Sequence, residues 1–393
     1  MKKYFSGLTK DSFFLGFVSF FADVASEMLY PILPIFITQN LKNGGSIVGI
    51  IEGIATATQY SVQGFSGWLS DKLQNRKYIA LFGYSLSALS KPLIGFATGW
   101  EEVLLARFMD RLGAGTRSAP RDALVAASVT EKNRGKAFGI EGIGDNLGAF
   151  VGPLIAIVLL FFLHVDIRNI FYLAFIPGIC AVLMALLVHE KKVITENHIK
   201  ITISHFPKSY WKYLFVTAIF GLGNSSNAFL ILQTRSVGVS LQTTILIYAF
   251  FNLVAALASY PSGFLSDLWG RKNILLFSFI IFIITYLGFA FSNNILILGF
   301  LFILYGTYQG IFRAVGKSLV TDLVPPYLRA SGVGWYSTTI GLSGLVASIM
   351  AGLLWDNVSH PAVFIYGASF AALGSITLLL LVSNRLKKKV IIS

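Results

Sequence analysis

Six ionisable side chains fall within a short stretch of an otherwise apolar part of the sequence. They are Arg107, Asp110, Arg111, Arg117, Arg121 and Asp122. Residues 103–106 and 123–129 on either side are apolar or small, and Pro120 is the only proline in the stretch. This pattern predicts one transmembrane helix, and ionisable groups at membrane depth normally face a protein interior or a water-filled cavity. The alternative is a short helix followed by a cytoplasmic loop that begins near Arg117.

Further ionisable residues lie in other apolar segments of the first half. At ~1.5 Å of rise per residue, one group falls between the membrane midplane and its outer third: Asp23, Glu27, Glu52, Lys91, Arg107, Asp110 and Arg111. Four acids there face three bases, so one carboxylate would lack a basic partner and could carry a proton near neutral pH.

This outer layer supplies the predicted proton-coupling residues, which are Asp23, Glu27, Glu52 and Asp110. Asp23 and Glu27 are favoured, because like charges one helical turn apart disfavour double ionisation. Lys91, Arg107 and Arg111 are predicted to bind substrate. The alternative is a static ion-pair network that only fixes helix packing.

A second layer lies nearer the expected cytoplasmic side and is predicted to act in gating. It contains Arg117, Arg121, Asp122, Glu141 and Asp145. The second half has no acid at membrane depth, and its polar residues predicted to bind substrate are Asn224, Asn227, Tyr308, Gln309 and Arg313. Asn224 and Asn227 would be one turn apart on the seventh helix, where hydrogen bonding between helices is the alternative role.

The composition identifies the class of protein that positions these residues. The chain has 393 residues, of which 55% are hydrophobic and 12% charged, and its mean hydropathy is +0.71. This balance predicts a helical protein that crosses a membrane several times. The net charge of +13 is interpreted as the Lys/Arg excess of cytoplasmic loops and not as a nucleic-acid signal.

Several classes of chemistry lack support in the sequence. Cys180 is the single cysteine, and the histidines are not paired at metal-ligand spacing. A nucleotide-binding loop of the form GxxxxGK[ST] and a nucleophile–base arrangement are also absent from the sequence. We therefore expect no enzyme activity, no metal and no cofactor, with a proton gradient as the driving force.

Apolar segments of about 20 residues, the length that spans a membrane, recur along the chain. The twelve expected spans are 12–38, 46–69, 78–98, 102–127, 136–162, 168–188, 210–233, 242–266, 273–292, 296–321, 329–353 and 362–383. Lys/Arg residues concentrate in alternate loops, which predicts that both termini are cytoplasmic. We expect a first bundle at 1–188, a cytoplasmic linker at 189–209 and a second bundle at 210–393.

The two halves repeat each other. GWLSDKLQNRK begins at Gly67 and GFLSDLWGRK at Gly263, an offset of 196 residues; RGKAFG at Arg134 and RASGVG at Arg329 are 195 apart, and Asp122 and Asp322 are 200 apart. Three matches at nearly one offset predict two six-helix halves related by an axis along the membrane normal.

These motifs resemble those of the major facilitator superfamily over essentially the whole chain. Its GxxxDxxGRK loop is matched by Gly263, Asp267, Gly270, Arg271 and Lys272. The first-half copy keeps Gly67, Asp71, Arg76 and Lys77 but has one extra residue, with Asn75 where glycine is expected. The resemblance implies that both copies gate the cytoplasmic side, and the Arg could pair with a carboxylate such as Asp122. Asp322 and Arg329 complete this predicted gating set.

Two glycine patterns extend the resemblance. Arg107, Gly113 and Gly115 are similar to a superfamily pattern that implies a link to proton coupling, although Arg111 replaces a glycine. Gly139, Gly148, Gly152 and Pro153 are similar to an antiporter pattern that lacks its final glycine pair here. That pattern implies export by exchange, and close helix packing is the alternative.

The stretches ADVASEMLYP, DRLGAGTRSAPRDAL and GNSSNAFL look like a bacterial and archaeal branch of efflux permeases. The resulting hypothesis is a monomeric secondary transporter of the inner membrane that exports a small organic solute by rocker-switch alternating access, with proton coupling, and that contacts membrane lipids but no nucleic acid. Uptake of an anionic metabolite or metal chelate, by symport or facilitated diffusion, is one alternative. A lipid flippase is another, and so is a membrane sensor.

Overall fold

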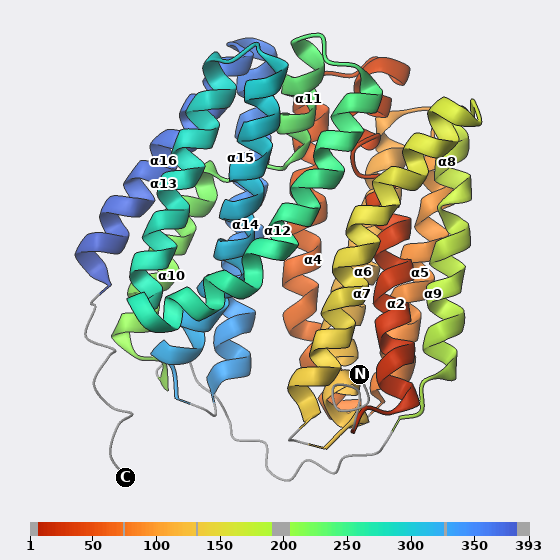
Figure 1. The fold of residues 1–393 in the computed structure, drawn as a ribbon, viewed down its shortest axis with the longest axis vertical. Coiled ribbons are helices and arrows are strands. Elements are labelled where there is room, and N and C mark those ends of the chain that lie inside the picture. The colour runs from red at the N-terminus through yellow and green to blue at the C-terminus, as the bar shows by residue number, and fades with distance from the viewer. Residues whose placement is uncertain (1–6, 74, 131–132, 191–204, 326–327, 383–393) are drawn as a thin grey trace. The chain divides into compact units, whose positions relative to one another are not determined.

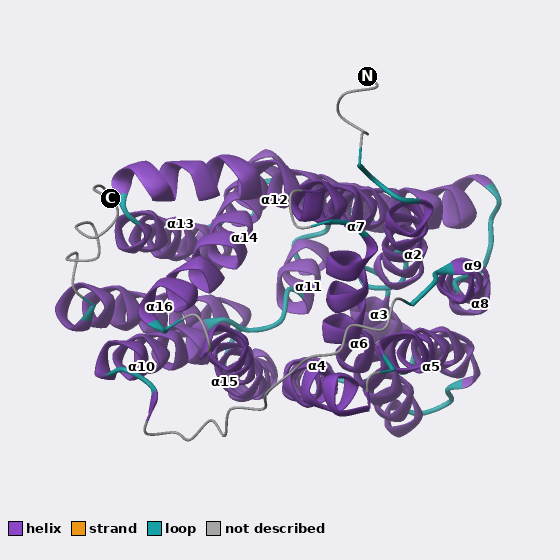
Figure 2. Ribbon diagram, turned by 90° about the horizontal axis from the view of Figure 1, so that it is seen from below, coloured by secondary structure: helices purple, strands orange, loops and turns teal. Residues whose placement is uncertain are grey.

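The computed structural model describes residues 7–73, 75–130, 133–190, 205–325 and 328–382. These parts of the chain are helices and loops without strands, so the predicted all-α class is confirmed (Figure 2). In the first half the helices are α2 (Lys10–Glu27), α3 (Leu33–Ile35), η1 (Phe36–Asn40), α4 (Gly45–Leu73), α5 (Arg76–Phe96), α6 (Trp100–Ser128), α7 (Arg134–Ile157), η3 (Val158–Phe162), α8 (Ile167–Leu173) and α9 (Phe175–Leu187). They continue with α10 (Lys208–Gly223), α11 (Ala228–Ser236), α12 (Leu241–Trp269), α13 (Arg271–Phe291), α14 (Ile295–Leu323), α15 (Arg329–Asn357) and α16 (His360–Leu381).

Within the described residues, nine helical segments are long and apolar enough to cross a membrane. They are α5, α7 with η3, α8 with α9, α10 with α11, α12, α13, α14, α15 and α16. The other three predicted spans fall on α2, α4 and α6. These helices carry more polar and charged side chains, which lowers their hydropathy, and they include all four predicted proton-coupling residues.

The helix that carries the six ionisable residues between Arg107 and Asp122 is continuous. Because α6 runs from Trp100 to Ser128 with Pro120 inside it, the alternative of a loop beginning near Arg117 is wrong. Two other predicted spans are interrupted. The first apolar span is broken after Glu27, where Pro31 and Pro34 follow, because proline removes a backbone donor and clashes within a helix.

The seventh predicted span is also broken, which corrects the placement of two candidate residues. Asn224 ends α10, with φ −91° and ψ 78°, and Asn227 precedes α11. They therefore lie in a non-helical segment and are not one turn apart on a helix. Glycine, asparagine and serine fill residues 221–227 apart from Leu222, and these residues are weak helix formers.

The chain divides into two compact units. The first takes its described residues from Met1–Asn43, Ile54–Asn197 and Ser240–Ala249, and the second from Gly44–Gly53, His198–Val239 and Phe250–Ser393. The two predicted bundles supply the larger part of each unit. In addition, the start of α4 groups with the second unit and the start of α12 with the first. Most of the predicted linker 189–209 lies outside the described residues.

Glycines set the helix packing of the first unit, in which α2 packs against α7 and α5 against α6 (Figure 1). A Cβ atom added at Gly148 of α7 would lie 2.9 Å from the Cβ atom of Asp23, and one at Gly152 would lie 2.8 Å from the backbone nitrogen of Met28. Both distances are too short for any other residue. Two of the predicted antiporter glycines, Gly148 and Gly152, thus bring the backbone of α7 directly against α2, whereas a Cβ atom at Gly139 would meet nothing within 4 Å.

The second unit has an aromatic core on α10, α13 and α14. The ring centroids of Phe220 and Phe279 are 3.9 Å apart, and so are those of Phe282 and Tyr286. The repeat seen in the sequence also appears in paired contacts. Lys77 Nζ donates to the backbone oxygen of Leu186 at 2.8 Å in the first unit, and Lys272 Nζ donates to that of Leu379 at 3.0 Å in the second.

Candidate functional site

Asp110 is the centre of a buried ion cluster in the first unit. Its Oδ1 atom lies 2.6 Å from Lys91 Nζ, and its Oδ2 atom lies 2.9 Å from Arg107 Nη1 and 2.9 Å from Arg111 Nη2. The Ser87 hydroxyl donates to Oδ1 at 2.6 Å. The side chains of Asp110 and Lys91 are 1% and 2% exposed. One acid therefore holds three bases, and burial of such charges is tolerated only when they are paired.

Two helices position this cluster. The three α6 residues are spaced i, i+3 and i+4, so they share one face of the helix. Lys91 comes from α5, which approaches α6 closely, since a Cβ atom at Gly83 would lie 2.6 Å from the backbone oxygen of Gly113. Lys91 also donates to the Ser26 hydroxyl of α2 at 3.2 Å, so the cluster connects three helices.

A second cluster surrounds Arg121 on the same helix. Its Nη1 atom is 2.9 Å from Glu141 Oε1 and 3.9 Å from Asp145 Oδ1, while Nη2 is 2.9 Å from Asp122 Oδ1. The Ser19 hydroxyl donates to Glu141 Oε1 at 2.9 Å. Four of the five residues predicted to form the inner layer are thus together.

Asp23 does not lie with the outer cluster in which it was predicted. Its carboxyl group interacts electrostatically with that of Asp145, a member of the inner cluster. The physical reason is the close contact at Gly148, which places α7 against α2 at the level of Asp23.

The other predicted acids have different surroundings. Glu27 accepts a hydrogen bond from the Tyr248 hydroxyl at 2.9 Å, and Tyr248 stacks on Tyr30 with ring centroids 5.5 Å apart. The Arg107 guanidinium lies 5.6 Å from the centroid of the Tyr30 ring. Glu52 is buried but belongs to the second unit, so the predicted outer layer of four acids and three bases is not a single cluster within either unit.

The polar residues of the second unit meet its aromatic core. Tyr305 donates to Asn227 Oδ1 at 2.8 Å, and Tyr308 is buried against Phe282 with ring centroids 4.9 Å apart. Gln309 Oε1 is buried without a hydrogen-bond partner among the described residues, whereas Arg313 is exposed. Arg313 therefore does not join Tyr308 in the core.

The second-half gating loop forms a compact arrangement. Gly270 has φ +89°, a left-handed conformation that glycine adopts without strain, and α13 begins at the next residue. Arg271 pairs with Asp322 of α14, and its Nη2 atom is 3.5 Å from Asp267 Oδ1. Lys272 makes the backbone contact to Leu379 given above. Asp322 is the counterpart of Asp122 in the repeat.

The first-half loop differs in detail. The backbone nitrogens of Arg76 and Lys77 donate to Glu190 Oε1 and Oε2 at 2.7 and 3.1 Å, so a carboxylate caps the N-terminus of α5. Asp122 pairs with Arg121. The side chain of Asp71 lies outside the described residues.

The structure also shows the surroundings of four other predicted gating residues. Gly67 faces α6, since an added Cβ atom would lie 3.2 Å from Ala119 Cβ, whereas at Gly263 such an atom would meet nothing within 4 Å. Pro153 lies inside α7. Arg329 Nε donates to the backbone oxygen of Thr321 at 3.3 Å.

Sequence reasoning missed several partners of the predicted site residues. Ser19 and Ser26 contact the two clusters, and together with Asp23 they follow a spacing of four and three residues, which marks one face of α2. That spacing could have identified them. Gln59, which accepts from Arg111 Nη1 at 3.1 Å, and Glu190 carried no comparable signal.

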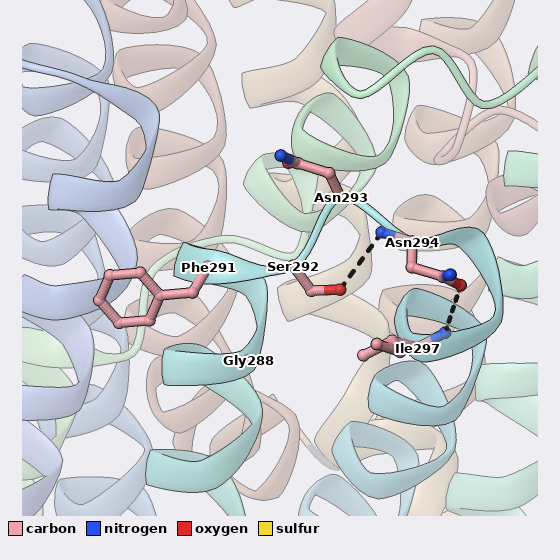
Figure 3. A pocket seen from close by; sticks show the side chains of 6 residues that line it. All are labelled: Gly288, Phe291, Ser292, Asn293, Asn294 and Ile297. Carbon is pink, nitrogen blue, oxygen red and sulfur yellow. Dashed lines mark hydrogen bonds between the residues drawn. The ribbon is translucent and has the colours of Figure 1, made fainter.

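A shallow hollow of about 560 Å³ lies at the turn between α13 and α14 (Figure 3). Its lining is Gly288, Phe291, Ser292, Asn293, Asn294 and Ile297. Asn294 Oδ1 accepts from the backbone of Ile297 at 3.4 Å and so caps the start of α14. The hollow contains none of the predicted site residues, and we assign it no function.

Comparison with known proteins decides the family. A family model described as Major Facilitator Superfamily matches residues 15–220 and 213–392. The chain belongs to the major facilitator superfamily. It is 34% identical over 383 residues to an uncharacterized MFS-type transporter of Methanocaldococcus jannaschii, with 95% of each chain covered. It is also 28% identical over 217 residues to the quinolone resistance protein NorA of Staphylococcus aureus, with 55% of each chain covered.

Solved structures support the same fold. The nucleoside transporter NupG matches with a TM-score of 0.77 at 15% identity, covering 95% of this chain and 99% of that one. A bacterial homologue of the human lysosomal transporter Spinster, in an inward-facing and occupied conformation, matches with a TM-score of 0.76 at 15% identity, covering 97% and 98%. The predicted fold class, a two-domain major facilitator fold, is thus confirmed, and the chain is a multi-pass membrane protein.

Proposed function

We propose that this major facilitator protein is a secondary active transporter that exports a small organic solute from the cell in exchange for protons. The observation that carries the proposal is that two carboxyl groups, Asp23 of α2 and Asp145 of α7, interact where the two helices approach closely at Gly148. We propose that one proton is held between these two carboxyl groups. Release of that proton would leave two negative charges in contact, so the protonation state of this pair is a natural switch.

The surrounding charges favour a proton over a metal ion as the coupled species. Arg121 lies 3.9 Å from Asp145, and it can neutralise that carboxylate once the proton has left. Arg117 also interacts electrostatically with Asp23. A site lined by arginines on one side repels a second cation but accepts the loss and gain of a proton.

Export is favoured by the partial similarity to a quinolone resistance protein and by the glycines of α7. The surplus of Lys/Arg in alternate loops favours a cytoplasmic membrane location with both termini in the cytoplasm. The chemistry of the second unit, where Asn227 bonds to Tyr305 beside an aromatic core, favours a solute with both apolar and hydrogen-bonding groups.

The test begins with a susceptibility screen, in which deletion and overexpression strains are compared against a panel of drugs and metabolites. A compound found in this way is then followed in proteoliposomes with and without an imposed pH gradient. We expect transport to depend on the gradient in the wild type and to lose that dependence in Asp23→Asn and Asp145→Asn. The matched control is Asp166→Asn, an exposed acid at the start of α8.

Two results would exclude proton exchange. One is transport that ignores the pH gradient in the wild type. The other is unchanged coupling in both aspartate variants while Asp166→Asn also behaves normally.

Uptake of an anionic metabolite is a second candidate, favoured by one observation. Lys91, Arg107 and Arg111 give three positive charges against the single negative charge of Asp110, a formal excess of two. Accumulation of labelled organic anions by cells that overexpress the protein, compared with the deletion strain, would favour this direction over export.

A further inference from the structure

The membrane-spanning segment formed by α10 and α11 is interrupted close to its midpoint. The two helices together form one apolar segment of 29 residues, and residues 224–227 between them are not helical. Ser225 is 5% exposed, and Asn224 and Asn227 are half-buried. Non-helical backbone at membrane depth is tolerated where it is buried in protein or lines a water-filled cavity. The break is therefore a place where backbone groups can meet a solute.

Most backbone N–H groups of the break have an acceptor. Those of Asn224 and Ser225 donate to backbone oxygens of α10 at 3.1 and 3.2 Å. That of Ser226 donates to the Ser348 hydroxyl of α15 at 3.1 Å. The N–H of Asn227 has no acceptor among the described residues, so the break keeps one backbone donor for a ligand.

The carbonyl oxygens of Asn224 and Ser225 are different, because they accept no hydrogen bond from the described residues. In a continuous helix their donors would be the N–H groups four residues later, those of Ala228 and Phe229. Both of these donate to Ser226 instead, at 3.3 and 3.1 Å. A buried backbone group without a protein partner needs water or a ligand. The break therefore offers a ligand two acceptors beside its one donor.

Tyrosine and serine side chains surround the break. Asn227 Oδ1 accepts from the Tyr305 hydroxyl, and the hydroxyl groups of Ser225 and Tyr286 are 3.3 Å apart. The ring centroids of Tyr286 and Tyr305 are 6.1 Å apart. No Asp, Glu, Lys or Arg occurs in the segments that supply the break and these partners, which are residues 213–234, 273–312 and 330–355. Because burying a charge without a partner is costly, these surroundings favour an uncharged polar group on an aromatic or apolar body.

We propose that the break between α10 and α11 binds a primary carboxamide of an aromatic solute. The two N–H bonds of the amide donate to the carbonyl oxygens of Asn224 and Ser225, and the amide oxygen accepts from the N–H of Asn227. This inference rests on the proposed function in one respect only, which is that the ligand is the exported solute.

The test uses the full-length protein purified in detergent at neutral pH, with four probes that share an indole ring. Indole-3-acetamide has the carboxamide, indole-3-acetate is an anion, tryptamine is a cation, and 3-ethylindole has no polar group on its side chain. A ligand that binds only the folded state raises the unfolding temperature in a saturable way. We expect indole-3-acetamide to do so at concentrations about tenfold lower than the others, because the anion and the apolar probe lack the matching donors and the cation introduces an unpaired charge.

Two outcomes of this comparison would overturn the proposal. One is the absence of saturable stabilisation by indole-3-acetamide, and the other is equal stabilisation by any of the other three probes. The measurement needs no ion gradient. Saturable binding of the amide with transport that ignores a pH gradient would exclude proton exchange alone, whereas gradient-dependent transport without amide binding would exclude the carboxamide site alone.

A change of charge assigns the binding to the break. Asn224→Asp keeps the size of the side chain and adds a negative charge beside the two carbonyl oxygens. We expect it to make tryptamine the preferred probe. Asn273→Asp, at an exposed position at the start of α13, is the matched control and should leave indole-3-acetamide preferred. An unchanged preference in Asn224→Asp contradicts the assignment.

A second pair of variants isolates the backbone donor. Asn227→Pro removes the N–H, and the φ of −57° at this position is one that proline adopts. Asn227→Ala is the matched control, because both variants lose the contact with Tyr305 but only the proline lacks the N–H. We expect a half-saturating concentration of indole-3-acetamide about tenfold higher in Asn227→Pro than in Asn227→Ala, which corresponds to about 1.4 kcal/mol. Equal values in the two variants contradict the role of this donor.

Discussion

Replacement of Asp110 by asparagine tests whether the buried cluster is held together as the distances indicate. The substitution keeps the size of the side chain and removes its charge, which leaves Lys91, Arg107 and Arg111 buried without their shared acid. At 2.9 Å and an effective dielectric constant of about 20, each Arg–Asp pair has a gross attraction of about 6 kcal/mol. Most of this is offset by the cost of removing the charges from water, and loss of one partner from a buried ion pair costs about 3–5 kcal/mol.

We therefore expect Asp110→Asn to lower the free energy of unfolding by about 3–5 kcal/mol. Lys91→Met should cost less, about 1.5–3 kcal/mol, the value of one hydrogen bond to a charged group. The difference arises because Asp110 retains Arg107 and Arg111 in the second variant. The measurement is titration of the purified protein from mild detergent into sodium dodecyl sulfate, with the helical circular dichroism signal as the readout.

The control for this pair is Glu101→Gln, an acid-to-amide change at an exposed position in the first turn of the same helix. Exposed substitutions of this kind usually change stability by less than about 0.5 kcal/mol. If Asp110→Asn stays within that range, or if Lys91→Met is the more damaging change, the cluster does not have the energetic role inferred from its geometry.

Three further predictions concern packing and the gating loops. In the same titration, Gly148→Val should destabilise the protein by about 1–3 kcal/mol through overpacking. The control Gly139→Ala should be nearly neutral, because a Cβ atom there meets nothing within 4 Å. Similar losses of stability in the two variants would contradict the close contact at Gly148. A double-mutant cycle of Arg271→Gln and Asp322→Asn should give a coupling energy of about 0.2–1 kcal/mol, because both side chains are partly exposed. A coupling energy of zero would show that the two residues do not form a stabilising ion pair. Glu190→Gln should weaken the cap of α5 by about 1 kcal/mol and speed amide hydrogen exchange in its first turn only; unchanged exchange there would refute the cap.

The sequence predicts helices well and their interruptions poorly. Hydropathy located the spans, and the spacing of charges on α6 correctly indicated one continuous helix. The break at Asn224 was missed because an apolar window averages over a few polar residues, although the glycines and serines around it are weak helix formers. The break after Glu27 could have been predicted from Pro31 and Pro34.

The partners of the charged residues were harder to predict than their depth. Counting residues along a helix gives height in the membrane but not the direction in which a side chain points. Asp110 and Lys91 were placed at similar depths, and the structure brings them together. Asp23 was assigned to the same layer, yet it interacts with Asp145 of the inner cluster, because the close approach at Gly148 sets how α2 and α7 cross. The sequence of a single chain does not predict how two helices cross.

One face of α2 therefore connects the two clusters. Ser19 donates a hydrogen bond to Glu141 beside Arg121, and Ser26 accepts one from Lys91 of the Asp110 cluster. Between them on the same face, Asp23 interacts electrostatically with Asp145. In the proposed exchange, loss of the shared proton would place two carboxylates in repulsive contact. Arg121, whose Nη1 atom is 3.9 Å from Asp145 Oδ1, can compensate for this charge, and a stronger pair there would pull α7 toward α6 and away from Asp23. Because glycine leaves no side chain between α2 and α7, a small shift of one backbone against the other meets little steric resistance. The same glycines that permit the contact between carboxylates thus also permit its release.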